Sequence, residues 1–276
     1  MIEPGKGRLA EIKLGFIGAG SMGGAIIRGL LAGGLVPREN LIYYDPDPAR
    51  QAQMDELGVS AALDNPEVMH AKVVVLGVKP QVLPGVLAGV KEFARPWHLI
   101  ISIAAGVPLE VLEGACPDSR VVRVMPNTPT LVGAGIAALA PGRGVTPEDL
   151  ALALDLFRAV GQAVVVEERL MDAVTGLSGS GPAFVAVFIE ALADGGVQMG
   201  LPRPLALTLA TQTVLGTARL CHEEQMPPAL LKDMVTSPGG TTIAGLHALE
   251  KRGFRGAVMD AVAAAAARSK ELGKTG

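Results

Sequence analysis

Cysteine and charge are both scarce in this chain of 276 residues. The two cysteines, Cys116 and Cys221, lie far apart and follow no metal-binding or redox spacing. The sequence therefore favours two free, buried thiols in a cytoplasmic protein over a disulfide framework. Charged residues make up only 18% of the chain, its net charge is −3, and it has no basic tract. These properties argue against nucleic acid as a partner.

The chain also lacks a long uninterrupted hydrophobic run, although 49% of its residues are hydrophobic and its mean hydropathy is +0.39. The apolar run between Arg203 and Arg219 is shorter than the ~20 residues that cross a bilayer. Residues 173–189 are interrupted by Gly-Ser-Gly-Pro, and residues 1–13 carry no apolar segment of a signal peptide. We therefore expect a cytoplasmic protein without a membrane span.

Three glycines follow a short apolar run near the start of the chain. Leu14–Ile17 has the composition of a buried strand. The pattern G-x-G-x-x-G follows at Gly18, Gly20 and Gly23, and a helical pattern comes next. Such glycines allow a tight turn, close passage of a pyrophosphate and close packing of helix on strand. A second predicted strand ends at Asp45, 22 residues after Gly23, where an acidic side chain can meet a ribose hydroxyl. The combined pattern favours dinucleotide binding over a bare packing turn.

Strand and helix patterns alternate in the first part of the chain, and only helical patterns occur from Met171 onward. Short apolar strands that alternate with helices are typical of a parallel sheet covered on both faces. The sequence thus predicts an α/β protein with a Rossmann-type parallel-sheet domain at residues 1–168 and an all-α dimerisation domain at residues 169–276. The expected strands are 14–17, 41–44, 73–76, 99–103, 121–125, 135–139 and 163–166, and the expected helices of the second domain are 182–199, 202–222, 229–235, 241–251 and 254–272.

Two of these helices are apolar nearly all round. Residues 182–199 carry only Glu190 and Asp194 as charges, and residues 202–222 are similar. Helices of this kind need neighbours on every side, and a domain of five helices can bury one of them but hardly two. We therefore expect both helices to lie in a subunit interface. The alternative is a compact bundle that remains monomeric.

A turn rich in glycine and hydroxyl groups separates two helical patterns within residues 231–250. Ser237-Pro-Gly-Gly240 ends one helix, and Thr241-Thr242 begins the next. The unpaired N–H groups and partial positive charge of a helix start suit a carboxylate, and the glycines let a ligand approach the backbone closely. The alternative is an ordinary corner with a threonine cap.

Together these segments resemble the pyrroline-5-carboxylate reductase family over nearly the whole chain, and the turn within residues 231–250 is the most specific of the matching motifs. Gly77 departs from the family pattern, in which alanine is usual, and residues 226–231 form a segment one residue longer than expected. The other matching segments are 18–23, 78–80, 102–106, 123–129 and 174–183.

The resemblance implies the reduction of a cyclic imine, in which hydride passes from the nicotinamide of NADPH or NADH to pyrroline-5-carboxylate and gives proline. It places the Thr242 hydroxyl at the ring nitrogen. It also implies a homodimer or a ring of dimers. The substrate would contact Ser237, Gly239, Gly240, Thr241 and Thr242, and the cofactor would contact Gly18, Ala19, Gly20, Ser21, Met22, Gly23, Asp45, Asn65, Val78, Lys79, Pro80, Ala104 and Asn127.

Three of these assignments have an alternative. Asn65 precedes Pro66 and is an equally good N-cap of a helix. Asn127 can contact the nicotinamide or the backbone of its own loop. Lys79 can lie along the cofactor, as the resemblance implies, or transfer a proton. The four histidines share no ligand spacing, so we expect no metal.

The segment after the second predicted strand bears on the choice of cofactor. Asp45 can accept hydrogen bonds from both ribose hydroxyls of NADH, whereas a 2′-phosphate would meet its charge and that of Asp47. Arg50 is the counter-argument, because a guanidinium can bind a phosphate bidentately. In a third interpretation, Asp45 and Asp47 are simply residues of a turn and of a helix cap. We expect both cofactors to work, with NADH preferred.

Two other functions were weighed against imine reduction. A β-hydroxyacid dehydrogenase has a similar order of domains, but it would want a lysine base on the long helix, where this chain offers Glu190 and Asp194. A dinucleotide-sensing regulator would need no substrate turn. Both explain the sequence less well than an imine reductase does.

Overall fold

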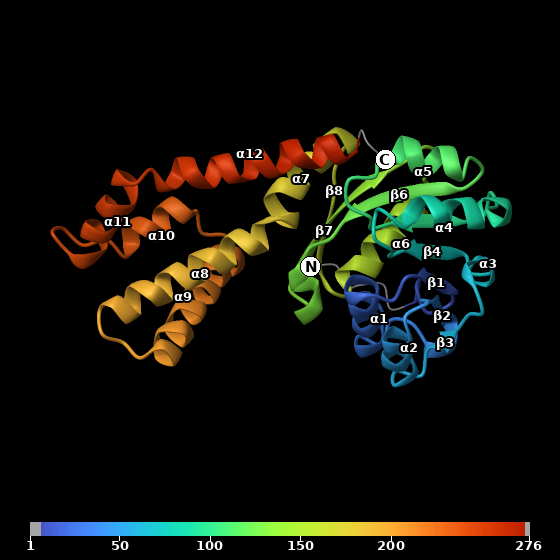
Figure 1. Cartoon of the computed structure of the whole chain (residues 1–276), viewed down its shortest axis with the longest axis horizontal. Coiled ribbons are helices and arrows are strands. Elements are labelled where there is room, and N and C mark those ends of the chain that lie inside the picture. The colour runs from blue at the N-terminus through green and yellow to red at the C-terminus, as the bar shows by residue number, and fades with distance from the viewer. Residues whose placement is uncertain (1–6, 274–276) are drawn as a thin grey trace. The chain divides into compact units, whose positions relative to one another are not determined.

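The computed structural model describes residues 7–273, and their contacts form two compact units (Figure 1). The first unit contains residues 7–180 and 264–273, and the second contains residues 181–263. The first six residues, which belong to the segment where no signal peptide is expected, lie outside the described range. The boundary predicted at residues 168/169, where strand patterns give way to helical ones, stays a prediction.

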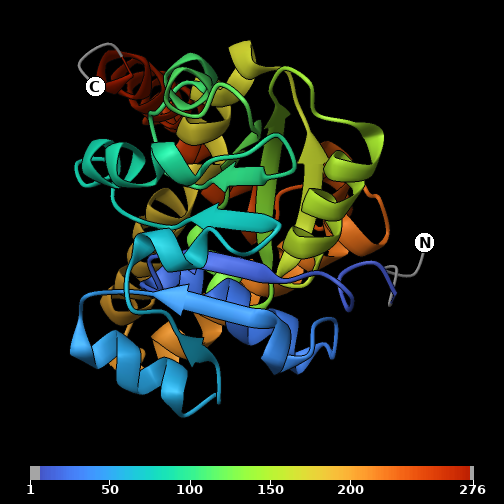
Figure 2. The same ribbon diagram turned by 90° about the vertical axis from the view of Figure 1, so that its right-hand side faces the viewer.

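An eight-stranded sheet is the frame of the first unit (Figure 2). Its order is β3-β2-β1-β4-β5-β6-β7-β8, and the strands from β3 to β6 are parallel. β1, β4 and β5 are buried along their whole length, which explains their nearly continuous apolar sequences. The bounds are β1 Leu14–Ile17, β2 Leu41–Tyr44, β3 Ser60–Ala61, β4 Val73–Leu76, β5 Leu99–Ser102, β6 Arg120–Met125, β7 Gly135–Pro141 and β8 Gly161–Val165.

Helices cover both faces of this sheet, as predicted. Successive residues of a strand point to opposite faces, so Phe16 belongs to one core and Ile17 to the other. The core around Phe16 includes side chains of α1, α2 and α6, and the core around Ile17 includes side chains of α3, α4 and α5. The bounds are α1 Ser21–Ala32, α2 Pro48–Asp55, α3 Asn65–Val68, α4 Leu83–Val90, α5 Leu109–Ala115 and α6 Pro147–Arg158, with 3-10 helices at Arg38–Asn40 (η1), Lys91–Phe93 (η2) and Thr128–Val132 (η3).

The far edge of the sheet differs from the all-parallel arrangement that the sequence predicted. β7 is antiparallel to β6, with Val124 opposite Leu139, and β8 is parallel to β7. Residues 126–134 connect β6 to β7 and contain only η3, which is too short for the crossover that a parallel pair requires. β7 and β8 are joined through α6, and that pair is parallel again. The prediction was wrong here because strand direction depends on the length of each connection.

The helical segment that follows β8 runs without the break predicted at Gly-Ser-Gly-Pro. It comprises η4 (Glu168–Leu170), α7 (Met171–Val174), a π-helical turn η5 (Thr175–Gly179) and α8 (Gly181–Gln198). The N–H of Ser180 donates to the Thr175 carbonyl at 2.8 Å, which keeps the helix hydrogen-bonded across this turn. The stretch Glu168–Gln198, with mean hydropathy 1.4, is long and apolar enough by composition to cross a membrane, and 11% of its most apolar window is buried.

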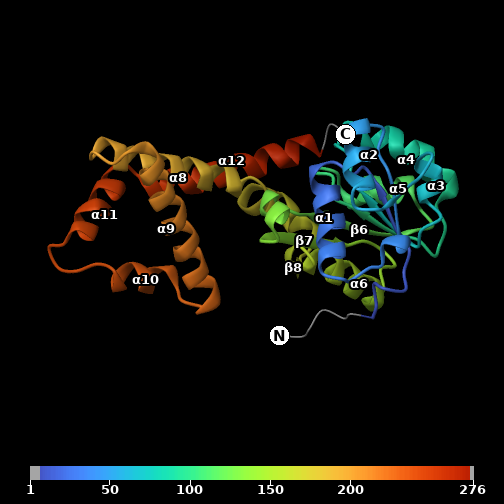
Figure 3. The same cartoon turned by 90° about the horizontal axis from the view of Figure 1, so that it is seen from below.

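The second unit has little core for the amount of apolar side chain that it carries. α8 and α9 (Arg203–Glu223) pack against each other around Ala193, Ala206 and Ala210 (Figure 3). Val187 on α8 is 65% exposed and Leu207 on α9 is 48% exposed. One copy of the chain therefore leaves uncovered the surface that the sequence predicted to lie in an interface. The remaining helices are α10 Pro228–Met234, α11 Thr241–Lys251 and α12 Phe254–Leu272.

Among the histidines, His98 is fully buried in the first unit and has a structural role. Its Nδ1 accepts from the Arg95 N–H at 2.9 Å, and its Nε2 lies 2.8 Å from the Met69 carbonyl oxygen. Burial lowers the pKa of His98, which favours the neutral ring that can accept at one nitrogen and donate at the other. Over residues 7–273, no three histidine, cysteine or acidic side chains form a group that could hold a metal ion.

Candidate functional site

The glycine loop joins β1 to α1 through very close backbone contacts. Gly18 has a φ of +95°, and a Cβ at this position would lie 2.8 Å from the carbonyl carbon of Gly77 after β4. A Cβ at Gly23 would overlap with the Gly18 carbonyl oxygen, whereas one at Gly20 would meet nothing within 4 Å. Gly18 and Gly23 thus build the loop itself, and Gly20 leaves its outer side open to a ligand.

The start of α1 provides backbone donors rather than a capped helix end. Its N-cap is Gly20, and no described side chain caps it. Side chains cap α2 (Asp47), α3 (Asp64) and α6 (Thr146). The helices α4, α5, α9 and α10 also lack a side-chain cap, but their N-cap residues are valine or proline, whereas that of α1 is glycine. The first N–H groups of an uncapped helix are free to bind an anion. The predicted segment Gly18, Ala19, Gly20, Ser21, Met22 and Gly23 therefore has the form of a pyrophosphate site.

Asp45 connects the end of β2 to this loop. Its side chain is nearly buried, with the residue 9% exposed, and its Oδ2 accepts from the Ala19 N–H at 2.8 Å. Its Oδ1 accepts from the Asp47 N–H at 3.0 Å. The guanidinium of Arg50 lies 3.9 Å from Asp47 and donates to Gln53 at 3.3 Å, so it contacts residues of its own helix. Asp45 is therefore fixed beside the loop, as a residue that reads the ribose must be.

The structure contradicts one of the two alternatives for Asn65, namely that it is the N-cap of a helix. The N-cap of α3 is Asp64, whose Oδ1 accepts from the Glu67 N–H at 2.9 Å, and Asn65 is the first helical residue. The Oδ1 of Asn65 is buried and has no hydrogen-bond partner among the described residues. Buried acceptors are nearly always paired, so this atom fits a partner supplied by a ligand or by water.

The segments after β4 and β5 lie at the same edge of the sheet as the glycine loop. Parallel strands in register end together, and the Gly77 N–H donates to the Ile17 carbonyl at 2.8 Å while the Ile103 N–H donates to the Leu76 carbonyl at 3.1 Å. Val78, Lys79 and Pro80 follow Gly77 directly, and Ala104 follows Ile103. The structure thus brings the segments predicted to hold the cofactor to the carboxyl edge of the sheet, where dinucleotides bind in such folds.

Asn127 is held within its own loop. Its Oδ1 accepts from the N–H of Ile136 at 2.9 Å, so it ties the end of β6 to the start of β7. Of the two alternatives for this residue, the contact to the loop backbone is confirmed, and a contact to the nicotinamide stays a prediction.

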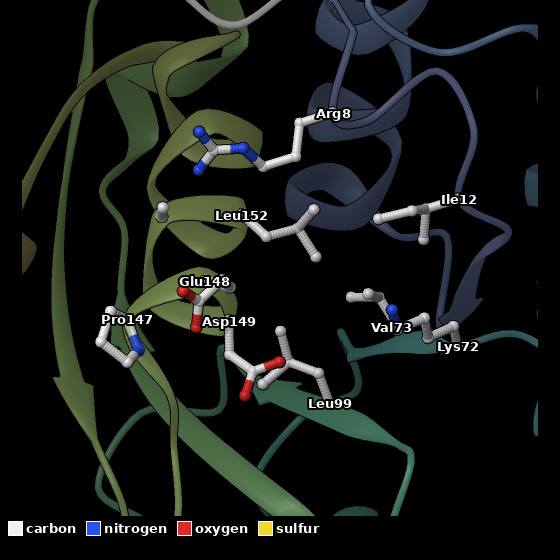
Figure 4. Close-up of a pocket in the computed structure, with 10 residues that line it drawn as sticks. Arg8, Ile12, Lys72, Val73, Leu99, Pro147, Glu148, Asp149 and Leu152 are labelled. Atoms are coloured by element: carbon white, nitrogen blue, oxygen red, sulfur yellow. The ribbon is translucent and has the colours of Figure 1, made fainter.

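A hollow of about 450 Å³ lies at the opposite edge of the sheet (Figure 4). It is bordered by Val73 and Leu99, the first residues of β4 and β5, and by the first turns of α6. Its Asp149 is already paired, with Arg120 at 2.9 Å and with the Thr146 hydroxyl at 2.9 Å. Because it lies at the amino ends of the strands, this hollow is separate from the site of the glycine loop.

The turn predicted to bind the substrate lies in the second unit. Gly239 has a φ of +66°, and the Gly240 N–H donates to the Ser237 carbonyl at 3.1 Å. A Cβ at Gly240 would overlap with the Ser237 hydroxyl oxygen. Gly240 is the N-cap of α11, which begins at Thr241, and no described side chain caps this helix. This second glycine-led helix start therefore presents free N–H groups beside the hydroxyls of Ser237 and Thr242.

Sequence reasoning missed one group of interactions near the loop after β5. Glu168 Oε1 accepts from Arg123 Nη1 at 2.7 Å and from the Leu109 N–H at 3.1 Å. Arg123 and Glu168 are 45 residues apart in the chain, and neither belongs to a spacing motif that connects them. No pattern in the sequence predicts this ion pair, because the two residues come together only in the folded chain.

Comparison with known proteins gives the same picture over the whole chain. Residues 168–272 match the model of pyrroline-5-carboxylate reductase dimerisation, and residues 13–106 match that of NADP oxidoreductase, coenzyme F420-dependent. The chain is 52% identical to the pyrroline-5-carboxylate reductase of Methanosarcina acetivorans, over 95% of this chain and 98% of that protein. It is 53% identical to that of Synechocystis, over 96% and 99%.

Solved structures agree with these matches. The Plasmodium falciparum pyrroline carboxylate reductase with NADP bound has a TM-score of 0.86 and 37% identity, covering 96% of this chain and 99% of that chain. The pyrroline-5-carboxylate reductase of Coxiella burnetii has a TM-score of 0.89 and 36% identity, covering 95% and 98%. The agreement extends over both units and includes the segment Glu168–Gln198, which lies within the matched dimerisation region.

The loop glycines give a test of the dinucleotide site. Gly20→Ala should leave the melting temperature unchanged, because its Cβ meets nothing within 4 Å, yet weaken cofactor binding by about tenfold or more by obstructing the pyrophosphate. Gly23→Ala should lower both the melting temperature and the cofactor affinity, because its Cβ would overlap with the Gly18 carbonyl oxygen. Calorimetric titration and thermal unfolding measure the two effects. Equal cofactor affinity in wild type and Gly20→Ala would contradict the assignment.

Proposed function

Because this chain belongs to the pyrroline-5-carboxylate reductase family, we propose that it holds its dinucleotide on the glycine loop of α1 and its substrate carboxylate at the start of α11. The chain is an NAD(P)H-dependent oxidoreductase that reduces pyrroline-5-carboxylate to proline. The observation that carries the proposal is the pair of helix starts led by Gly20 and Gly240, which no described side chain caps. Each presents the donors that an anionic group requires.

The described residues fit the dinucleotide. Free donors at the start of α1 match a pyrophosphate, the carboxylate of Asp45 matches ribose hydroxyls, and the unpaired Oδ1 of Asn65 matches a donor on the nucleoside. When bound, the reduced nicotinamide supplies the hydride that adds to the imine carbon. Val78, Lys79, Pro80, Ala104 and Asn127 would line the remaining length of the cofactor.

Thr242 is the residue proposed to act on the substrate. It is the second residue of α11, half-buried, and its hydroxyl can donate to or accept from the ring nitrogen. Addition of hydride requires an electron-poor C=N bond, so a proton must remain on that nitrogen, and a hydroxyl that accepts the N–H hydrogen bond keeps it there. Positioning of this kind contributes about 7–11 kcal/mol to rate enhancement, so the step does not need a strongly acidic side chain.

The substrate carboxylate would lie on the N–H groups that follow Gly240, with the Ser237 hydroxyl as a further donor. Gly240 has no Cβ, so the Ser237 oxygen can lie directly against its Cα. Gly239 takes the left-handed φ that the turn requires. Carboxylate and ring nitrogen are a fixed distance apart in the substrate, and Ser237, Thr241 and Thr242 are fixed on one turn. This favours a small cyclic imino acid over a 3-hydroxyacid.

The hydroxyl of Thr242 can be tested directly. Thr242→Ala should lower kcat/KM for pyrroline-5-carboxylate by about one to three orders of magnitude, because the lost hydrogen bond strengthens in the transition state. Cofactor affinity should change little. Thr242→Ser restores the hydroxyl and should recover most of the activity. Loss of absorbance at 340 nm measures turnover, and wild-type turnover in Thr242→Ala would show that another group holds the ring nitrogen.

The matched family model and the solved Plasmodium falciparum relative both name NADP, but from the residues after β2 we propose that this chain accepts both cofactors and prefers NADH. The Asp45 carboxylate accepts two backbone N–H bonds, yet its oxygens can still accept ribose hydroxyls. A 2′-phosphate would bring further negative charge beside Asp45 and Asp47. Arg50, the candidate counter-charge, is turned toward Asp47 and Gln53 of its own helix.

The ratio of kcat/KM for NADH to that for NADPH tests this preference. Asp45→Asn keeps an acceptor for the Ala19 N–H but removes the charge, so the ratio should shift toward NADPH by about tenfold or more. A general weakening of the loop cancels in the ratio, because both cofactors use the same loop. A wild type that prefers NADPH tenfold and is indifferent to Asp45→Asn would overturn the preference but not the reaction.

The chain self-associates through its dimerisation domain, and we propose that its dimers assemble further into a ring and that it works in the cytoplasm. Support comes from the amount of apolar surface on the second unit, where Leu209, Leu215 and Met259 are each about half exposed or more. Two cysteines without a disulfide, Cys116 and Cys221, suit a reducing compartment.

Solution mass tests the assembly. Multi-angle light scattering should give an even multiple, above two, of the 28.3 kDa chain. Leu207→Glu places a charge on the exposed face of α9 and should lower the mass, because a buried charge without a partner opposes association. A 28.3 kDa wild-type particle at micromolar concentration would contradict self-association, and a stable dimer would contradict the ring only.

A further inference from the structure

The last turns of α12 belong to the first unit, where they lie against the loop that follows β5. A Cβ at Gly106 of this loop would be 3.4 Å from the Cβ of Leu272, and a Cβ at Gly273 would be 3.0 Å from the Gly106 carbonyl oxygen. Gly106 itself is buried and has a φ of +76°. The end of α12 therefore packs closely against the loop: a side chain at Gly273 would press on the Gly106 carbonyl, and one at Gly106 would contact Leu272 and be strained by the positive φ.

A buried hydrogen bond holds the end of α12 in this position. Ser269 is 4% exposed, and its hydroxyl donates to Asp172 Oδ1 at 2.7 Å. Ser269 and Asp172 are 97 residues apart in the chain. Alanine would stabilise a helix more than serine does, and five alanines precede this turn at residues 263–267. The serine therefore contributes through its bond to Asp172 rather than through helix formation.

The same helical segment also holds the far end of the loop. Glu168 lies one turn before Asp172, and its Oε1 binds the Leu109 N–H and Arg123 Nη1. The loop from Ile103 to Leu109 is thus tied at its end by Glu168 and supported at its centre by the helix end that Asp172 secures. Its beginning is fixed to β4 through the Ile103 N–H. Ala105 is exposed in this loop, whereas the Ala104 side chain is 3% exposed and packs in the core around Ile17, so Ala104 can meet a ligand only through its backbone.

We infer that Ser269 and Asp172 are positioning residues for hydride transfer: they set the place of Gly106 and, through it, of Ala104 on the nicotinamide side of the cofactor. This rests on the proposed role of Ala104 in cofactor binding. Without the hydrogen bond, the end of α12 can withdraw from Gly106, and the loop that carries Ala104 gains freedom. Hydride transfer is sensitive to small changes in the distance between the reacting carbons, so turnover falls while the substrate turn of α11 is untouched.

The test compares Ser269→Ala and Asp172→Ala with two matched variants. Asp172→Asn retains an oxygen that accepts from the Ser269 hydroxyl, and Lys270→Ala changes the exposed neighbour on the same turn. Ser269→Ala and Asp172→Ala should lower kcat by about three- to tenfold, the range of one lost hydrogen bond. The primary isotope effect with cofactor deuterated at the transferred position should rise, and KM for pyrroline-5-carboxylate should stay within about twofold. Asp172→Asn and Lys270→Ala should resemble wild type.

Two further measurements separate the possible failures. A melting temperature that falls in Ser269→Ala, with kcat and isotope effect unchanged, would show a purely structural bond and overturn the inference. Ala104→Val tests the assignment on which the inference rests. If Ala104→Val impairs cofactor turnover while Ser269→Ala does not, the inference is wrong and the cofactor site stands. If Ala104→Val has no effect on cofactor affinity or turnover, the assignment of Ala104 is wrong, and the inference falls with it.

Discussion

Backbone contact between Gly18 and Gly77 determines where the nucleotide loop of this protein lies. The two residues continue neighbouring strands, and each would collide with the other if either had a Cβ. The loop is therefore seated on the end of β4, and Gly23 closes it from the side of α1. Asp45 reaches the same loop through the Ala19 N–H. The position of the glycine loop, the proposed cofactor site, thus depends on the register of three parallel strands, and a shift of any one of them would move it.

The structure of the second unit is limited by a different factor: a small group of helices can bury only a limited amount of apolar surface. Its internal core consists of Ala193, Ala206 and Ala210, with Ile189 and Val197 beside them. The large aliphatic side chains of α8 and α9 point away from this core. Self-association covers such surface, and it also accounts for a helical stretch whose composition resembles a membrane span. The high hydropathy of the chain is thus a property of its assembly.

Much of the fold follows from local sequence patterns. Residues 14–17, 241–251 and 254–272 were predicted with the bounds that the structure shows, because continuous apolar runs and glycine boundaries mark such elements. The direction of β7 was not predicted correctly, because it depends on the short connection through η3. The sequence predicts a break at Gly-Ser-Gly-Pro, residues 179–182, because glycine and proline usually end helices, whereas the structure passes through a π turn at residues 175–179 into α8. Tertiary hydrogen bonding overrides that tendency here.

The candidate site likewise combines local features that the sequence predicts with long-range contacts that it does not. The glycine loop and the turn at Ser237–Thr242 are contiguous in sequence, so their anion-binding form could be predicted. One of the two alternatives for Asn65, the N-cap of α3, is wrong because Asp64 takes that role; both side chains can cap helices, and only the backbone conformation decides between them. The bonds of Arg123, Glu168, Asp172 and Ser269 join distant residues, and a single sequence carries no signal for them.

The small alanine core of α8 and α9 also has a consequence for how the protein is made. Most of the first unit is synthesised before α8, and it can complete its sheet without the rest of the chain. Only its last helical turns, around Ser269, arrive at the end of synthesis. The helices of the second unit bury most of their apolar surface only when two chains associate. Their folding rate should therefore depend on the square of the protein concentration. Resistance to heat and to proteolysis should therefore rise with protein concentration in the cell, and newly made chains keep this apolar surface exposed for longest when they are few.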